Sequence, residues 1–210
     1  MASIKFFAIA DLHDRENVLM NIKSFDFSGF DAIIMAGDIS SYYIFADQVI
    51  NVVKSIGLPC FYVPGNNESF EIERKYRDAG LSIHNKVVNF KSYKIAGFGF
   101  SPITPFETPG ELEEDEIMRQ MKNLDIDNNT ILITHCPPKG ILDKGYGSIS
   151  ISSIIKEKKP LLNVFGHIHE VVGIEKHENT YFINLPPAKE GKAGVIRVNK
   201  NDVEVDFIEI

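Results

Sequence analysis

The chain of 210 residues is 44% hydrophobic and 24% charged, and 22 Lys and Arg residues against 29 Asp and Glu residues give it a formal net charge of −7. A chain of this length buries roughly 70% of its unfolded surface on folding, so intrinsic disorder and a small disulfide scaffold are excluded and one domain over residues 1–210 is expected. The acidic balance argues against nucleic acid as a partner, because binding to its phosphate backbone requires a basic surface.

The sequence predicts neither a membrane segment nor a secretion signal. Its apolar runs stop far short of the ~20 residues that a membrane helix needs. The apolar segment 1–10 lacks the basic start and the small-residue cleavage site of a signal peptide and leads directly into Asp11. The two cysteines, Cys60 and Cys136, match no metal-binding or redox spacing, so a reducing compartment and a cytoplasmic location are expected.

In the first half of the chain, short apolar runs alternate with segments of helical periodicity. This pattern is typical of strand–helix–strand units around a mainly parallel sheet. The predicted strands of this half are 4–10, 31–36 and 58–63, and the predicted helices are 18–25, 49–56 and 68–79.

The second half begins with two strands joined by a tight turn and ends with a series of short strands that we expect to pair antiparallel. Segment 99–110 is too rich in Pro and Gly to form the interior of an element. The acidic run 111–116 is expected to open a helix through residue 124, because negative charge is favoured at a helix N-terminus. The predicted strands are 86–90, 93–98, 130–134, 161–165, 170–176, 181–185, 194–198 and 203–208, and a further helix begins near residue 148. An exposed edge at 203–208 could support a homodimer.

Five apolar runs are followed by residue types that bind metal ions. These residues are Asp11 and His13, Asp38, Asn66, His135, and His167 and His169. Ligands of open α/β sheets gather at the carboxyl ends of the strands, so a parallel sheet would bring all of them to one edge. Residues two apart on an extended backbone point the same way, which would pair Asp11 with His13 and His167 with His169, while Leu12 and Ile168 point to the core.

Seven such ligands suit two metal ions that share Asp38 as a bridge. Imidazole, carboxylate and amide ligands without thiolate favour Mn²⁺, Fe, Zn²⁺, Co²⁺ or Ni²⁺ over Ca²⁺ or an iron–sulfur cluster. Two ions roughly 3.5–4 Å apart clamp a phosphoryl centre and lower the pKa of a bridging water, which attacks in line. Each residue alone is more often structural, and the glycines before Asp38, Asn66 and His167 could mark ordinary turns, so the hypothesis depends on their conjunction.

The order of these residues resembles the five motifs of the calcineurin-like metallophosphoesterase superfamily, and most closely its small, single-domain, phosphodiesterase-like prokaryotic branch. The matching segments are Asp11-Leu-His13, Gly37-Asp38, Gly65-Asn66-Asn67-Glu68, His135 and Gly166-His-Ile-His169. The resemblance implies the metallo-dependent phosphatase fold, a four-layer α-β-β-α sandwich of two mixed β-sheets flanked by helices. It also implies two divalent ions, with Mn favoured. The first would be held by Asp11, His13, Asp38 and His169, and the second by Asp38, Asn66, His135 and His167.

One position departs from the commonest pattern of that superfamily. Many members have a His after the Asn, thought to protonate the leaving group, where this chain has Asn67. An amide can hydrogen-bond a phosphate oxygen but cannot give up a proton near neutral pH, and loss of a general acid typically costs ~10²–10⁴ in rate. Small members of the superfamily that also lack this His resemble phosphodiesterases.

We therefore predict a metal-dependent hydrolase that cleaves phosphodiester bonds of a small phosphate ester by attack of a metal-bridging hydroxide. The candidate catalytic residues are Asp38, Asn66, Asn67 and His135. The alternatives are a phosphomonoesterase and a catalytically weak metal-binding scaffold module with the same fold.

The remaining candidate residues are open to more than one interpretation. Asn67 and Arg15 could hold a phosphate oxygen, although a solvated arginine at a helix start is at least as consistent with the pattern. Glu68 could orient neighbouring ligands or be a carboxylate in the first turn of a helix. His84 is predicted to be a structural residue, and His177 to be exposed near a hairpin turn.

Overall fold

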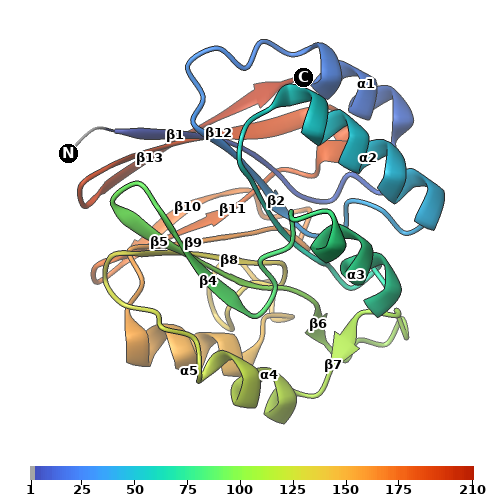
Figure 1. The fold of residues 1–210 in the computed structure, drawn as a ribbon. Helices are drawn as coiled ribbons and strands as arrows, with labels where there is room; N and C mark the ends of the chain where they lie inside the picture. The colour runs from blue at the N-terminus through green and yellow to red at the C-terminus, as the bar shows by residue number, and fades with distance from the viewer. Residues whose placement is uncertain (1–2) are drawn as a thin grey trace.

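Two large β-sheets lie face to face in the computed structural model, which describes residues 3–210 (Figure 1). The strands of the first sheet are, in order across it, β13 (Asp202–Glu209), β12 (Lys192–Asn199), β1 (Ile4–Ile9), β2 (Ala32–Ala36) and β3 (Cys60–Val63). Those of the second are β10 (Gly173–His177), β11 (Thr180–Asn184), β9 (Leu162–Phe165), β8 (Thr130–Thr134), β5 (Tyr93–Phe98) and β4 (Lys86–Phe90). Both sheets are mixed, since each combines parallel and antiparallel neighbours.

Helices cover the outer face of each sheet. The helices are α1 (Glu16–Ser24), α2 (Tyr43–Ile56) and α3 (Phe70–Asp78) beside the first sheet, and α4 (Glu114–Met121) and α5 (Ile149–Lys158) beside the second (Figure 1). The predicted four-layer α-β-β-α sandwich is therefore confirmed. Within residues 3–210, no helix combines the length and the hydropathy that crossing a membrane would require.

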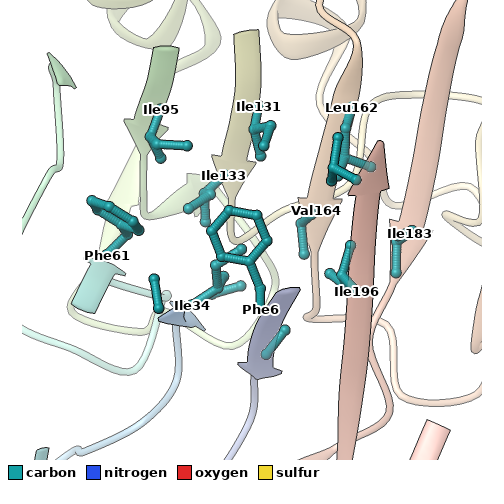
Figure 2. Packing of buried hydrophobic residues seen from close by; sticks show 14 of the residues in the cluster. Phe6, Ile34, Phe61, Ile95, Ile131, Ile133, Leu162, Val164, Ile183 and Ile196 are labelled. Atoms are coloured by element: carbon teal, nitrogen blue, oxygen red, sulfur yellow. The ribbon is translucent and has the colours of Figure 1, made fainter. Parts of the chain in front are cut away.

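The central core fills the space between the two sheets. Phe6 and Ile34 of the first sheet meet Ile131, Ile133 and Val164 of the second there (Figure 2). Alternate residues of the same strands pack in the opposite direction, against the helices, as Phe7 and Met35 do. Because both faces of these strands are buried, their sequences read as continuous apolar runs rather than alternating ones.

The parallel strands point their carboxyl ends toward one edge of the sandwich. In the first sheet β1, β2 and β3 run parallel. In the second sheet β5, β8, β9 and β11 do the same. The metal-binding residue types predicted after these strands therefore come from two sheets, and not from one parallel sheet as the strand–helix pattern alone suggests.

Two further expectations are corrected by the structure. The acidic run does not begin the helix, because Glu111 and Leu112 form a short strand, β7 (Glu111–Leu112), and α4 starts only at Glu114. The Glu111 carboxylate accepts hydrogen bonds from the Thr108 N–H and from the hydroxyls of Thr104 and Thr108, which hold this residue outside a helix. Its partner strand β6 (Ser101–Pro102) lies inside the Pro-rich segment that we expected to be irregular.

The strands at the end of the chain are not all antiparallel. β11 pairs parallel with β9 and antiparallel with β10, because the chain first forms the edge strand β10 and then returns between β10 and β9. Hydrophobic periodicity shows that a strand is half-buried or buried, but it carries no information about which neighbour the strand joins.

Candidate metal centre

Loops from both sheets bring the seven predicted metal ligands together. The first loops are joined by hydrogen bonds from the Asp11 N–H to the Gly37 carbonyl (2.9 Å) and from the His13 N–H to the Asp38 carbonyl (3.0 Å). The two sheets are joined where the His167 N–H donates to Asp11 Oδ2 (3.0 Å). The centre therefore lies between the sheets and belongs to neither alone.

A first group of ligand atoms is formed by Asp11, His13 and His169, whose candidate atoms all lie within 4.8 Å of one another. His169 Nε2 lies 3.1 Å from Asp11 Oδ1, and His13 Nε2 lies 3.8 Å from the same oxygen. Among residues 3–210, neither Asp11 Oδ1 nor His13 Nε2 meets hydrogen-bond criteria with any partner, although both atoms are buried. Buried polar atoms without partners are costly, and a cation between them would satisfy both, so the residues fit a metal ion.

Asp38 connects this group to a second one. Its Oδ2 lies 3.8 Å from His13 Nε2, and its Oδ1 lies 3.6 Å from His135 Nε2. The two oxygens of one buried carboxylate therefore face two different sets of ligands, which is the arrangement that a bridging carboxylate needs.

The second group surrounds His135. Its Nε2 lies 3.0 Å from Asn66 Oδ1 and 3.1 Å from His167 Nδ1. Its Nδ1 lies 2.9 Å from the Ala36 carbonyl, which can only accept, so Nδ1 carries the proton and Nε2 faces the centre. Asp11, Asp38 and His135 also place their ligand atoms within 4.8 Å of one another, so Asp11 reaches both groups. The assignment of each residue to one ion stays a prediction.

Asn66 is oriented by a residue that the sequence motifs do not contain. Asn66 Nδ2 donates to the Thr108 hydroxyl (3.1 Å), which itself donates to Glu111 (2.6 Å). This contact directs the carbonyl oxygen of the amide, the atom that can bind a metal, toward His135. Thr108 lies in the Pro-rich segment, where no sequence signal separates it from its neighbours.

Glu68 is the structural support of the two loops that carry Asp38 and Asn66. Its buried carboxylate accepts hydrogen bonds from the backbone N–H groups of Asp38, Ile39, Ser40 and Gly65 at 2.6–2.9 Å. Burial and the neighbouring Asp38 carboxylate raise the pKa of Glu68 to about 8, while the hydrogen bonds from Ser40 and Gly65 act in the opposite direction. Of the two interpretations of this residue, the structure agrees with the orienting one, since Glu68 precedes the first turn of α3.

The loop backbone at the centre is not extended, contrary to our expectation. Residues with positive φ are Asp11 (57°), His13 (46°), Asp38 (53°) and His167 (71°). Non-glycine residues rarely adopt this left-handed conformation, and it is typically retained at functional sites where the surroundings enforce it. Leu12 and Ile168 are nevertheless buried in the core as predicted.

The glycines before three of the motif residues are required by close approach. A Cβ on Gly65 would lie 2.1 Å from Asp38 Oδ1, and one on Gly166 would lie 2.4 Å from Asp11 Oδ2. A Cβ on Gly37 would lie 2.5 Å from His135 Nδ1. These glycines therefore allow the ligands to gather, and they do more than mark turns.

The histidines of the centre have pKa values set by burial and by the two aspartates. Burial, and then His135, lower the pKa of His167 to about 4, and burial lowers the pKa of His13. For His135, burial acts to lower the pKa, but the Asp38 and Asp11 carboxylates raise it above its ordinary value. Neutral imidazoles at His13 and His167 are in the form that binds metal ions.

Comparison with known proteins agrees with this geometry. The family model of calcineurin-like phosphoesterases matches residues 4–171. The chain belongs to this family.

Relatives of this phosphoesterase include an uncharacterized protein of Methanocaldococcus jannaschii, MJ1162, which is 31% identical over 202 residues, 88% of this chain and 88% of that protein. A protein of Fibrobacter succinogenes named "Probable cyclic nucleotide phosphodiesterase" is 22% identical over 189 residues, 83% of this chain and 72% of that protein. The crystal structure of TT1561 of Thermus thermophilus has the same fold, with a TM-score of 0.77 at 18% identity over 98% of this chain and 99% of that chain.

Asn67, at the position where many calcineurin-like phosphoesterases have a His, contacts Asp38. Its backbone N–H donates to Asp38 Oδ1 (2.8 Å) and its side-chain amide donates to Asp38 Oδ2 (2.5 Å). The amide thus holds the carboxylate that lies between the two ligand groups. Arg15 is exposed just before α1, and its side chain forms no ion pair with any residue in the described range 3–210. Contact of either residue with a substrate stays a prediction.

Lys189 is the second residue of this phosphoesterase that sequence reasoning missed. Its Nζ lies 3.0 Å from His169 Nδ1, and its backbone N–H donates to the Asp11 carbonyl (3.0 Å). A signal was present, because Lys189 follows β11, and β11 runs parallel to β9 and ends at the same edge. We did not use this signal, because we expected the strands at the end of the chain to be antiparallel.

The two histidines outside the centre agree with the predictions of a structural His84 and an exposed His177. His84 is buried, and its Nδ1 accepts a hydrogen bond from the Gly99 N–H (3.0 Å). His177 is exposed and contacts Glu175. Cys60 and Cys136 are buried and free.

Proposed function

We propose that this protein is a phosphodiesterase that hydrolyses small phosphate esters at a centre of two divalent transition-metal ions. The observation that carries the proposal is the position of Asp38, whose two carboxylate oxygens face two different groups of ligands. One group contains Asp11, His13 and His169, and the other contains Asn66, His135 and His167.

The donor atoms support a choice of metal. They are imidazole nitrogens and carboxylate and amide oxygens, which suit Mn²⁺, Fe, Zn²⁺, Co²⁺ or Ni²⁺, and we favour Mn²⁺. When bound, such ions would polarise the phosphoryl group and lower the pKa of the water that attacks it.

The residues of this chain then define what kind of ester is cleaved. We assign catalytic roles to Asp38, Asn66, Asn67 and His135. Asn67 supplies two N–H donors that hold Asp38, but no proton for a leaving group. Esters whose leaving group departs without protonation lose least from this arrangement, which favours diesters with acidic leaving groups. The name of the Fibrobacter succinogenes relative is consistent with such a substrate.

We further propose a cytoplasmic protein with a small-molecule substrate. Two buried free cysteines agree with a reducing compartment. The formal charge of −7 disfavours long polyanions such as nucleic acids as substrates.

The test is a matrix of metals and substrates. Metal-free protein is reconstituted with each of the five metals and assayed on bis(para-nitrophenyl) phosphate and on para-nitrophenyl phosphate. We expect metal-dependent hydrolysis that is faster on the diester, and its reduction by about a hundredfold or more in Asp38→Asn, because the carboxylate between the ligand groups is lost. Asp47→Asn is the matched control, since Asp47 is an exposed carboxylate of α2 that pairs with Lys75 of α3.

Asn67→His in the same matrix tests the argument about the leaving group. A positioned imidazole should raise monoester hydrolysis, by up to about a hundredfold, and change diester hydrolysis less. An unchanged ratio of the two rates would refute that argument. A wild type that prefers the monoester would identify a phosphomonoesterase, and a metal-replete protein inert toward both esters would identify a scaffold module.

A further inference from the structure

Lys189 is held beside the metal centre by its backbone. The N–H groups of Ala188 and Lys189 donate to the carbonyls of Ala10 and Asp11 at 2.8 and 3.0 Å. These bonds fix the short helical turn Ala188–Glu190 against the loop that carries the first motif. The backbone of Lys189 is therefore fixed beside the centre by the fold.

The lysine lies on the side of the centre that faces solvent. The side chains of His13 and His169 are 25% and 29% exposed, whereas those of Asp11, Asp38 and His135 are 3% exposed or less. The open side of the centre therefore includes His13 and His169, together with the half-buried His167 and Asn67. Lys189 is half-buried, contacts His169 and lies near enough to His13 to act on its charge.

The contact between Lys189 and His169 cannot persist in the working centre. A histidine that gives its Nε2 lone pair to an ion keeps its proton on Nδ1, so it has no lone pair there for a lysine. His169 Nε2 is the atom that faces Asp11 and the first ligand group, and Nδ1 is the atom that faces Lys189. Once His169 acts as a ligand, the ammonium group needs another acceptor.

No carboxylate of residues 3–210 pairs with Lys189, although the Lys189 charge contributes, after Lys192, to lowering the pKa of Glu190. Glu190 itself pairs with Lys192. The carboxylate of Asp11 is directed into the centre. A phosphoryl group at the open side would bring unprotonated oxygens to the ammonium group, and charge-assisted hydrogen bonds of this kind are among the strongest in proteins.

We propose that Lys189 binds a phosphoryl oxygen of the substrate at the mouth of the metal centre, an inference that rests on the proposed function. This gives the site a cationic contact for substrate, whereas the amide of Asn67 is occupied with Asp38 and Arg15 lies exposed before α1. Lysine is suited to this role, because its flexible stem allows the ammonium group to move from His169 to an incoming anion.

The experiment compares Lys189→Met, which removes the charge, with Lys189→Arg, which keeps it. The primary measurement is the dissociation constant of inorganic phosphate for metal-loaded protein by calorimetry, with metal content determined on the same samples. Loss of a hydrogen bond to a charged group predicts weakening by about ten- to a hundredfold in Lys189→Met, with a similar rise in KM for bis(para-nitrophenyl) phosphate. Lys189→Arg should retain most of the affinity. Lys94→Met is the control, because Lys94 pairs with Asp125 and Asp127 near the amino end of β5, away from the edge that carries the centre.

Two results would overturn the inference. One is a phosphate affinity and a KM in Lys189→Met within about twofold of the wild-type values. The other is a loss of affinity that follows a loss of bound metal, which would mean that Lys189 only supports His169. Failure of the proposed function has a different signature, because wild-type protein would then hydrolyse no ester while phosphate binding still reports on Lys189.

Discussion

Glu68 shows how a single residue organises the centre without touching a substrate. Four backbone N–H groups converge on its carboxylate, three from the loop after β2 and one from Gly65 after β3. A fully buried carboxylate without partners would be costly, and so would four buried N–H groups without acceptors. The Glu68 carboxylate and the four N–H groups therefore satisfy one another. The acidic residue that ends the Gly65-Asn66-Asn67-Glu68 motif is thus explained by the loops that it joins.

His84 makes a pH-dependent contribution to stability at a site away from the metal ligands. Burial lowers its pKa from 6.5 to about 4. Between these values the unfolded chain binds a proton that the folded chain does not, so stability rises with pH in this window and falls as pH decreases through it. We expect the free energy of unfolding to lose about 3 kcal/mol from this residue between about pH 6.5 and pH 4.

His84→Asn isolates this contribution, because the Asn carbonyl oxygen can accept the hydrogen bond from Gly99 but does not titrate. Chemical denaturation of metal-free protein across the window should show a shallower pH dependence in the variant. His177→Asn, at an exposed histidine, should follow the wild type. Parallel curves for His84→Asn and wild type would contradict the assignment.

At the residue scale, the sequence predicted which residues gather at the centre better than it predicted their surroundings. The ligands lie directly after buried strands, where the general behaviour of parallel sheets places binding residues. Thr108 and Lys189 were missed because their positions depend on contacts between segments that are distant in the chain. The left-handed backbone of Asp11 and Asp38 was also missed, since it is enforced by neighbouring loops and not by the residues themselves.

The elements of this fold differ in how well the sequence predicts them. The strands β4, β5 and β8 have the bounds that their apolar runs predict, and Ser148 caps α5 through a hydrogen bond from the Ile151 N–H. The short strands β6 and β7 were not predicted, because two residues carry no periodicity. They pair with each other, and hydrogen bonds from the Thr108 N–H and hydroxyl hold the Glu111 side chain at the start of β7.

The segment that contains β6 and β7 positions Asn66, a predicted metal ligand, and Thr108→Val tests this. Removal of the hydroxyl leaves Asn66 Nδ2 without its acceptor, so the amide is free to rotate. We expect metal affinity to fall by about tenfold, as is typical when a contact that orients a ligand is removed, together with a loss of about 1 kcal/mol in unfolding free energy. Competition with a chelator measures the affinity.

Thr104→Val is a close control, because Thr104 donates to the same Glu111 oxygen but does not contact Asn66. Equal affinities in the two variants would contradict a positioning role for Thr108.

Across the whole molecule, the exposed strand predicted near the C-terminus is indeed the edge of the first sheet. This strand, β13, carries Asp202, Glu204 and Asp206 at exposed positions. Antiparallel pairing of two copies would bring these like charges together. Charged side chains on an edge strand commonly prevent unwanted pairing in this way. The homodimer through this edge stays a prediction, and the acidic side chains indicate that salt would strengthen it.

The two sheets share the metal centre, so metal binding should stabilise the whole sandwich. Asp11, Asp38 and Asn66 come from loops of the first sheet, whereas His135 and His169 come from loops of the second. Without ions, the buried carboxylates of Asp11 and Asp38 bring negative charge together at this edge, and divalent ions would reverse its sign. The formal charge of −7, which counts these buried carboxylates, therefore says little about the charge that the centre presents once ions are bound.

We expect chelation to lower the melting temperature by about 5–10 °C. Metal at a hundred times its dissociation constant stabilises the folded state by about 2.7 kcal/mol, and each kcal/mol corresponds to about 2–4 °C for a chain of this size. Calorimetric scans with and without a chelator measure the difference. Asp38→Asn, which lacks the carboxylate between the two ligand groups, should show a much smaller difference, while Asp47→Asn should match the wild type. A wild-type melting temperature unaffected by metal, in protein shown to bind it, would mean that the sheets pack fully without the ions and that the centre serves chemistry alone.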